Sequence, residues 1–139
     1  MPKHILIPVD GSPQSTAALS FVADEWPDAE VTILHVINPA EGGGNPSTGI
    51  PSGAEEWFES EKERSALLLA DASSIVDHSV RTRTGVGRPT RTILDAVEDG
   101  EFDHVVMGSH GRSGVSRILL GSVTEAVVRE SPVPVTVVR

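Results

Sequence analysis

The sequence predicts an α/β fold, a doubly wound five-stranded parallel sheet with helices on both faces. Short apolar runs typical of buried strands alternate along the chain with stretches of helical periodicity. Two of the expected strands have the character of sheet edges, because one is polar and the other contains a proline. The length of 139 residues suits one domain, residues 1–139, and is too short for two.

The first half of the chain supplies two apolar strands and two helices. Ile5–Val9 and Val31–Ile37 are rich in β-branched and other apolar residues and predict buried strands. After the first strand, Ser12 suits a helix N-cap and Pro13 the first helical position. The expected buried stripe of that helix is Ala17, Ala18, Phe21 and Val22.

The two strands are followed by a segment rich in Gly, Pro and Ser, residues 38–53, which predicts a flexible loop. A loop of this length in a compact domain is either mobile or functional. The next helix is expected from Glu55 to about Val76, with early acids that suit the positive end of the helix dipole. Its expected buried face includes Ala66, Leu69 and Ala70.

The second half supplies three strands and two helices. Ser79–Thr84 alternates polar residues and predicts an edge strand, whereas His104–Met107 predicts a buried one. Val133–Val138 is the last strand, and Pro134 inside it indicates an edge. Helices are expected with Ile93, Leu94 and Val97 facing inward and, further on, at least over Ser122–Arg129.

The third and fifth strands have the character of edges, and the strand order 3-2-1-4-5 places these two at the two ends of the sheet. That order creates a topological switch between strands one and four, and open α/β sheets bind ligands at such a switch, beyond the carboxyl ends of the strands. The loops expected to meet there are Asp10–Ser12 and Gly108–Gly114. The richest glycine turn of the sequence therefore falls where the fold binds a ligand.

The net charge of −9 argues against a nucleic acid partner, because phosphate backbones are repelled. An acidic surface with nine Arg and two Lys is of the sort used in a very salty cytoplasm, and an ordinary acidic protein fits equally well. The absence of cysteine excludes disulfides and thiolate metal sites. No apolar run approaches the roughly 20 residues of a membrane span, and no signal peptide is evident, so we expect a cytoplasmic protein.

The second loop has the composition of a phosphate site. Glycines at 108, 111 and 114 let the backbone approach a ligand, and a helix N-terminus follows Gly121-Ser122. Residues 104–124 contain Arg112 and Arg117 and no acid, so this stretch is cationic within an acidic protein. The alternative is a turn whose glycines only permit tight packing. The spacing matches neither a Walker loop nor the dinucleotide fingerprint.

The segment Gly108-x2-Gly111-x9-Gly121-Ser122 resembles the ATP-binding signature of the universal stress protein family. The opening strand Ile5–Ser12, the segment Leu34-His35-Val36 and the end Ser131–Val138 resemble the same family. The resemblance covers the chain apart from residues 38–53, and it implies an adenine nucleotide alpha hydrolase-like fold. The nucleotide contacts that it implies are Pro8, Val9, Asp10, Ser12, Ile37, Met107, Gly108, Ser109, His110, Gly111, Arg112, Gly121, Ser122, Val123 and Thr124.

The resemblance further implies a stress-response protein that binds ATP, together with Mg or Mn, and acts by binding instead of fast catalysis. It implies a homodimer through the last strand, about Val133–Val138. No catalytic residue and no protein-held metal site are expected. Two other functions stay open: a slow ATPase or phosphotransfer enzyme that uses His110 in the same pocket, and a nucleotide-free chaperone-like or scaffold dimer.

Several single residues have a structural alternative to their functional interpretation. Asp10 suits contact with a base or ribose, or it caps the turn at the strand end. The family more often has a small or acidic residue at position 88, and Arg88 is expected on the far side of the sheet from the nucleotide. The arginines at 81, 83, 88 and 91 form an anionic-partner surface or pair with surface acids. The histidines show no metal-binding spacing.

Overall fold

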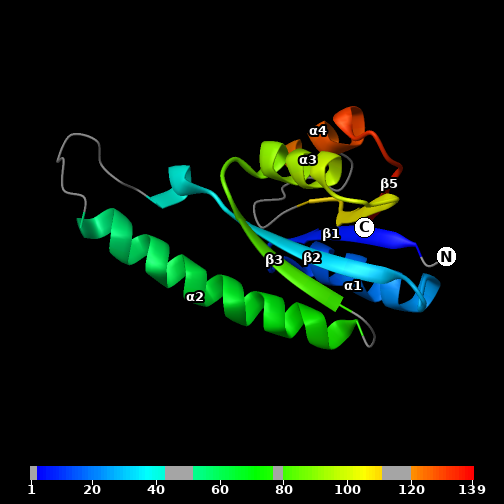
Figure 1. The fold of residues 1–139 in the computed structure, drawn as a ribbon, viewed down its shortest axis with the longest axis horizontal. Coiled ribbons are helices and arrows are strands. Elements are labelled where there is room, and N and C mark those ends of the chain that lie inside the picture. The colour runs from blue at the N-terminus through cyan, green and yellow to red at the C-terminus, as the bar shows by residue number, and fades with distance from the viewer. Residues whose placement is uncertain (1–2, 43–51, 77–79, 111–119) are drawn as a thin grey trace.

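The computed structural model describes residues 3–42, 52–76, 80–110 and 120–139. Five strands form one parallel sheet in the order β3-β2-β1-β4-β5, as the sequence predicts, with helices on both faces (Figure 1). The elements are β1 (His4–Val9), α1 (Pro13–Glu25), β2 (Glu30–Ile37), the 3₁₀ helix η1 (Pro39–Gly42), α2 (Ser52–Ile75), β3 (Val80–Val86), α3 (Pro89–Asp99), β4 (His104–Gly108), α4 (Ser122–Glu130) and β5 (Val135–Val138).

Strand β1 is the centre of the sheet. It pairs with β2 over its whole length and with β4 through Ile5 and Leu6, opposite His104 and Val105. The helix that follows β1, α1, packs in one core of the sheet through Leu19 and Val22, whereas α4, which follows β4, packs in the other through Val127, so the connections from the carboxyl ends of β1 and β4 leave the sheet on opposite faces. The switch point therefore lies between them, where the sequence predicts it.

Two separate apolar cores sandwich the sheet, and alternate residues of β1 serve each of them. Ile5 and Ile7 face the core beneath α1 and α2, whereas Leu6 faces the core beneath α3 and α4. All three side chains are 0% exposed, so β1 is buried on both faces. The predicted inward residues of α3, Ile93, Leu94 and Val97, are all buried, which confirms the periodicity of that helix. Ile93 and Val97 lie in the second core.

The buried face of α2 is rotated from the predicted one. Ala66 and Ala70 are exposed, and only Leu69 of the predicted stripe is buried. The stripe passes instead through Ser65, Leu69, Ala72 and Val76. Apolarity alone pointed to the alanines, but alanine is compatible with either side of a helix, whereas the true stripe includes a buried polar residue.

Ser65 is buried because it connects three elements. Its hydroxyl lies 2.9 Å from Nδ1 of His35 on β2 and 2.8 Å from the hydroxyl of Thr84 on β3. A polar side chain can occupy a core position when its hydrogen bonds are made there. This contact fixes α2 against the edge of the sheet.

The ends of several elements differ from the sequence prediction. Helix α2 begins at Ser52, inside the predicted loop 38–53 and three residues before the expected start at Glu55. Strand β3 continues to Val86, because Ile37 of β2 pairs with Val86. Strand β5 begins at Val135, so Pro134 precedes it; a proline has no N–H to donate to the ladder. The predicted loop 38–53 begins with the 3₁₀ helix Pro39–Gly42, and its residues 43–51 lie outside the described part of the chain.

Among the helices that the structure describes, none is both long enough and apolar enough to cross a membrane.

His104 gives the fold a pH dependence that can be measured. Burial, and secondly the ammonium of Lys3, lower the pKa of His104 below the ordinary histidine value of 6.5. The unfolded chain then binds this proton more readily than the folded chain, so stability falls as the pH drops below about 6.5. We therefore expect the melting temperature of His104→Gln to fall less than that of the wild type when the pH is lowered from about 7.5 to about 5.5.

His4→Gln is the matched control, because His4 begins the neighbouring strand β1 and leaves His104 in place. Parallel pH profiles for the wild type and His104→Gln would contradict the assignment.

Candidate functional site

The turn after β1 forms one wall of the predicted site. Gly11 has φ +81°, a left-handed conformation that favours glycine. Oδ1 of Asp10 accepts the N–H of Ser12 at 2.9 Å, and Oγ of Ser12 accepts the N–H of Ser15 at 3.1 Å. Asp10 therefore performs the turn-capping role weighed for it, and the hydroxyl of Ser12 caps α1. Pro8 and Val9 complete β1 directly before this turn.

The base of the glycine loop is closed by three hydrogen bonds of 2.8 Å. The hydroxyl of Thr124 on α4 donates to the carbonyl of Gly108, and the N–H of Gly121 donates to the carbonyl of Ser109. The N–H of Ser109 in turn donates to the carbonyl of Val138 at the end of β5. The residues on both sides of the loop are thereby held together at the carboxyl ends of β4 and β5.

These bonds define how Thr124 acts. Its side chain is 3% exposed and its one donor is already given to Gly108. Thr124 therefore positions the N-terminus of α4 against β4, and its hydroxyl has no second proton to donate to a phosphate.

Gly108 is required by packing. A Cβ at this position would lie 2.7 Å from the backbone carbonyl carbon of Gln14 on α1, a distance that real Cβ atoms essentially never show. At position 108 the glycine thus permits tight packing, which is the alternative to a ligand-binding role that the sequence left open. Met107 before it is 5% exposed and lies in the core beneath α3 and α4.

His110 presents a buried nitrogen, Nε2, that no described residue satisfies. Its Nδ1 lies 3.2 Å from the hydroxyl of Ser109, which is itself 6% exposed. Its Nε2 is buried and makes no hydrogen bond with any residue that the structure describes. Buried polar atoms in native proteins are nearly always paired, so an orphan at a strand end is the sort of atom that a ligand satisfies.

The N-terminus of α4 adjoins this histidine through the bonded pair Ser109 and Gly121. Gly121 is the N-cap and has no side chain with which to cap the first N–H groups. Ser122 is exposed at the first position, and Val123 packs against the core beneath α3 and α4. The first turn of α4 can therefore offer backbone N–H groups to an anion. The predicted contacts Gly111 and Arg112 lie outside the described residues.

The matching family model, described as "Universal stress protein family", spans residues 1–139. The chain belongs to the universal stress protein family. Universal stress protein MJ0531 of Methanocaldococcus jannaschii is 32% identical over 140 residues, which cover 99% of this chain and 82% of that protein. Universal stress protein MJ0577 of the same organism is 33% identical over 158 residues, covering 100% of this chain and 96% of that protein.

Solved structures agree on the fold. The structure of MJ0577 matches with a TM-score of 0.78 and 34% identity, covering 99% of this chain and 96% of that one. A universal stress protein solved in complex with cAMP matches with a TM-score of 0.62 and 23% identity, covering 99% and 97%. This second likeness shows the shared fold alone.

The sequence predicts Arg88 on the far side of the sheet from the nucleotide. In the structure of this universal stress protein, Arg88 lies instead at the carboxyl ends of the strands. It follows β3, and in a parallel sheet the carboxyl ends of all strands share one edge. The N–H of Gly87 donates to the carbonyl of Ile37, a predicted nucleotide contact, at 2.9 Å. Sequence reasoning missed Arg88 and Asn38 at this edge, although the predicted strand order already placed both of them there.

Thr124→Val tests the closure of the glycine loop. The variant keeps the shape of the side chain and leaves the carbonyl of Gly108 without this donor, so we expect a loss of about 1–3 kcal/mol in the free energy of unfolding. Urea denaturation measures it. Thr124→Ser keeps the hydroxyl and should stay near the wild type. A Thr124→Val variant as stable as the wild type would contradict a stabilising role for this hydrogen bond.

Proposed function

We propose that this universal stress protein binds ATP at the switch between β1 and β4 and acts through that binding in a stress response. The observation that carries the proposal is the buried Nε2 of His110, just after β4, which makes no hydrogen bond with the described residues. It lies beside an N-terminus of α4 that has no side-chain cap. A phosphate or ribose oxygen would satisfy both groups, because each offers N–H donors.

In this proposal the residues that follow β4 hold the phosphates. His110, the backbone of Ser109 and the first turn of α4 surround them, with Gly111 and Arg112 as further predicted contacts. Asp10 and Ile37, at the ends of β1 and β2, lie on the side of the base. A Mg or Mn ion would bind between the phosphate oxygens, where it neutralises their charge.

The proposal includes a cytoplasmic homodimer that pairs through β5. This strand is an outer strand of the sheet, and its four residues are half-buried in the single chain. An outer strand offers unpaired backbone groups to a second copy. Occupancy of the pocket would reach that edge through Ser109, whose N–H bonds to Val138. Little or no hydrolysis is expected, since the sequence supplies no Walker lysine and no evident general base.

His110→Ala tests the proposed site. Removing a hydrogen bond to a charged phosphate should weaken ATP binding by about tenfold or more, measured by isothermal titration calorimetry. His4→Ala is the matched control, because His4 begins β1 at the opposite edge of the sheet. Acid extraction of the purified protein, followed by chromatography, would identify any nucleotide that it already carries.

The same preparation separates the other functions. A folded wild-type protein that neither carries nor binds adenine nucleotide would refute the proposal and favour the nucleotide-free scaffold. Steady release of phosphate from ATP, abolished in His110→Ala, would instead identify a slow ATPase.

A further inference from the structure

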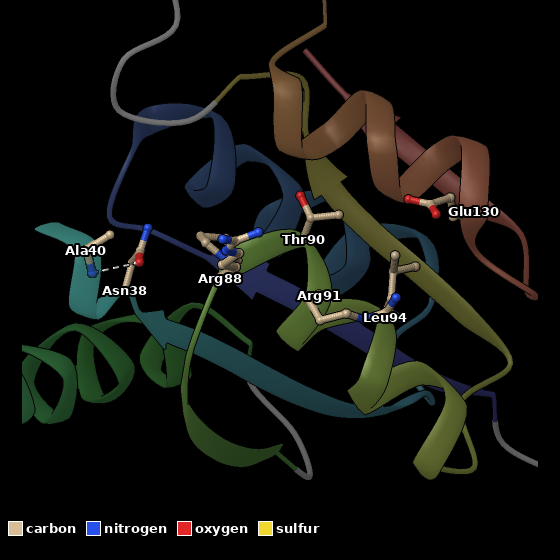
Figure 2. Close-up of a pocket in the computed structure, with 8 residues that line it drawn as sticks. Asn38, Ala40, Arg88, Thr90, Arg91, Leu94 and Glu130 are labelled. Atoms are coloured by element: carbon tan, nitrogen blue, oxygen red, sulfur yellow. Dashed lines mark hydrogen bonds between the residues drawn. The ribbon is translucent and has the colours of Figure 1, made fainter.

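A cavity of about 460 Å³ opens at the carboxyl ends of β2 and β3 (Figure 2). Asn38 and Ala40 line it from the end of β2 and from η1, and Arg88 lines it from the turn before α3. Figure 2 shows Arg88 and Asn38 beside one another, with Glu130 of α4 on the opposite side of the view. The other lining residues are Pro89, Thr90, Arg91 and Leu94 of α3. The cavity therefore adjoins the end of β2, because Asn38 follows the predicted base contact Ile37 directly in the chain.

The backbone fixes the position of Arg88. The preceding Gly87 has φ +149°, which favours glycine, and a Cβ there would lie 2.8 Å from the hydroxyl oxygen of Thr92. Its N–H is bonded to the carbonyl of Ile37, and the carbonyl of Arg88 accepts the first hydrogen bond of α3 from Thr92 at 2.9 Å. Arg88 thus leaves a defined turn that adjoins the end of β2.

Arg88 has no structural use that would explain its presence. It is the N-cap of α3 and makes no side-chain cap bond, at a position where Asp, Asn, Ser or Thr stabilise a helix. Its positive charge stands at the positive end of the helix dipole, which is unfavourable. Among the residues that the structure describes, it forms no ion pair, whereas Arg91 lies 3.0 Å from Asp95 and 4.0 Å from Glu98.

The place of Arg88 in the sheet decides which part of a nucleotide it can reach. With neighbouring strands about 4.8 Å apart, the end of β3 lies about 10 Å from that of β1 and about 14 Å from that of β4. Phosphates at the glycine loop are therefore remote, and the base side is near. A planar guanidinium stacks on aromatic faces, and a purine offers a large one.

We propose that Arg88 stacks on the base of the bound nucleotide and sets the preference of this site for a purine. The inference rests on the proposed function, because it needs a nucleotide at the switch point. Ligand binding would then explain why an arginine that destabilises the start of α3 stands at this position.

Calorimetric titration of the full chain with ATP, AMP and CTP tests the inference. We expect Arg88→Ala to weaken ATP binding by about five- to thirtyfold, and AMP binding by the same factor, since both share the base. The preference for ATP over CTP should narrow, and Arg88→Lys should not restore it, because an ammonium lacks the planar face. Arg83→Ala, an exposed arginine on β3, is the matched control.

Thermal unfolding without ligand supplies the second readout. Arg88→Asp should raise the melting temperature, since aspartate caps a helix and suits its dipole, while it still weakens ATP binding. A lower melting temperature would show a structural role and overturn the inference. A loss of affinity that is larger for ATP than for AMP would indicate a phosphate contact and also overturn it.

The two proposals fail in different ways. If Arg88→Ala binds ATP as tightly as the wild type does, the role of Arg88 is overturned and the proposed function still stands. A wild type that binds no nucleotide would overturn both.

Discussion

The burial of β1 on both faces and along both edges is the constraint on which the rest of the structure depends. A strand whose side chains face two apolar cores must be covered by helices on each side. Its parallel partners lie on opposite sides of it in the sheet: β2, which follows α1, on one side, and β4, which follows α3, on the other. The connections that follow β1 and β4 therefore diverge at their carboxyl ends, and this divergence creates the place for a ligand.

The carboxyl ends of the strands, where this place lies, are fixed by hydrogen bonds after β4 and carry positive charge after β3. The hydrogen bonds of Gly108 and Ser109 close the base of the glycine loop with groups of the chain itself, and they hold the N-terminus of α4 in place. Preorganised donors bind anions at a lower entropic cost than mobile ones. At the β3 end of the same edge, Arg88 and the start of α3 add positive charge in a protein of net charge −9. The overall acidity thus does not describe this edge.

Apolar periodicity predicted the fold well because burial leaves a strong pattern in a sequence. The strand order and the inward residues of α3 followed from it. The buried face of α2 was mispredicted because its register depends on Ser65, and the sequence does not reveal that a serine will find His35 and Thr84 as partners. The sequence likewise does not reveal that the hydroxyl of Thr124 donates to the carbonyl of Gly108, since a hydroxyl fits a ligand and a carbonyl equally well.

The sequence by itself determined the fold, the switch point and the glycine-rich loop, because these depend on local composition and on the order of strands. Only the tertiary structure decided which polar groups find hydrogen-bond partners within the chain. It assigned the hydroxyl of Thr124 to Gly108 and left Nε2 of His110 without a described partner. Hydrogen bonds between residues distant in sequence depend on positions of a few tenths of an ångström, and packing alone sets those positions.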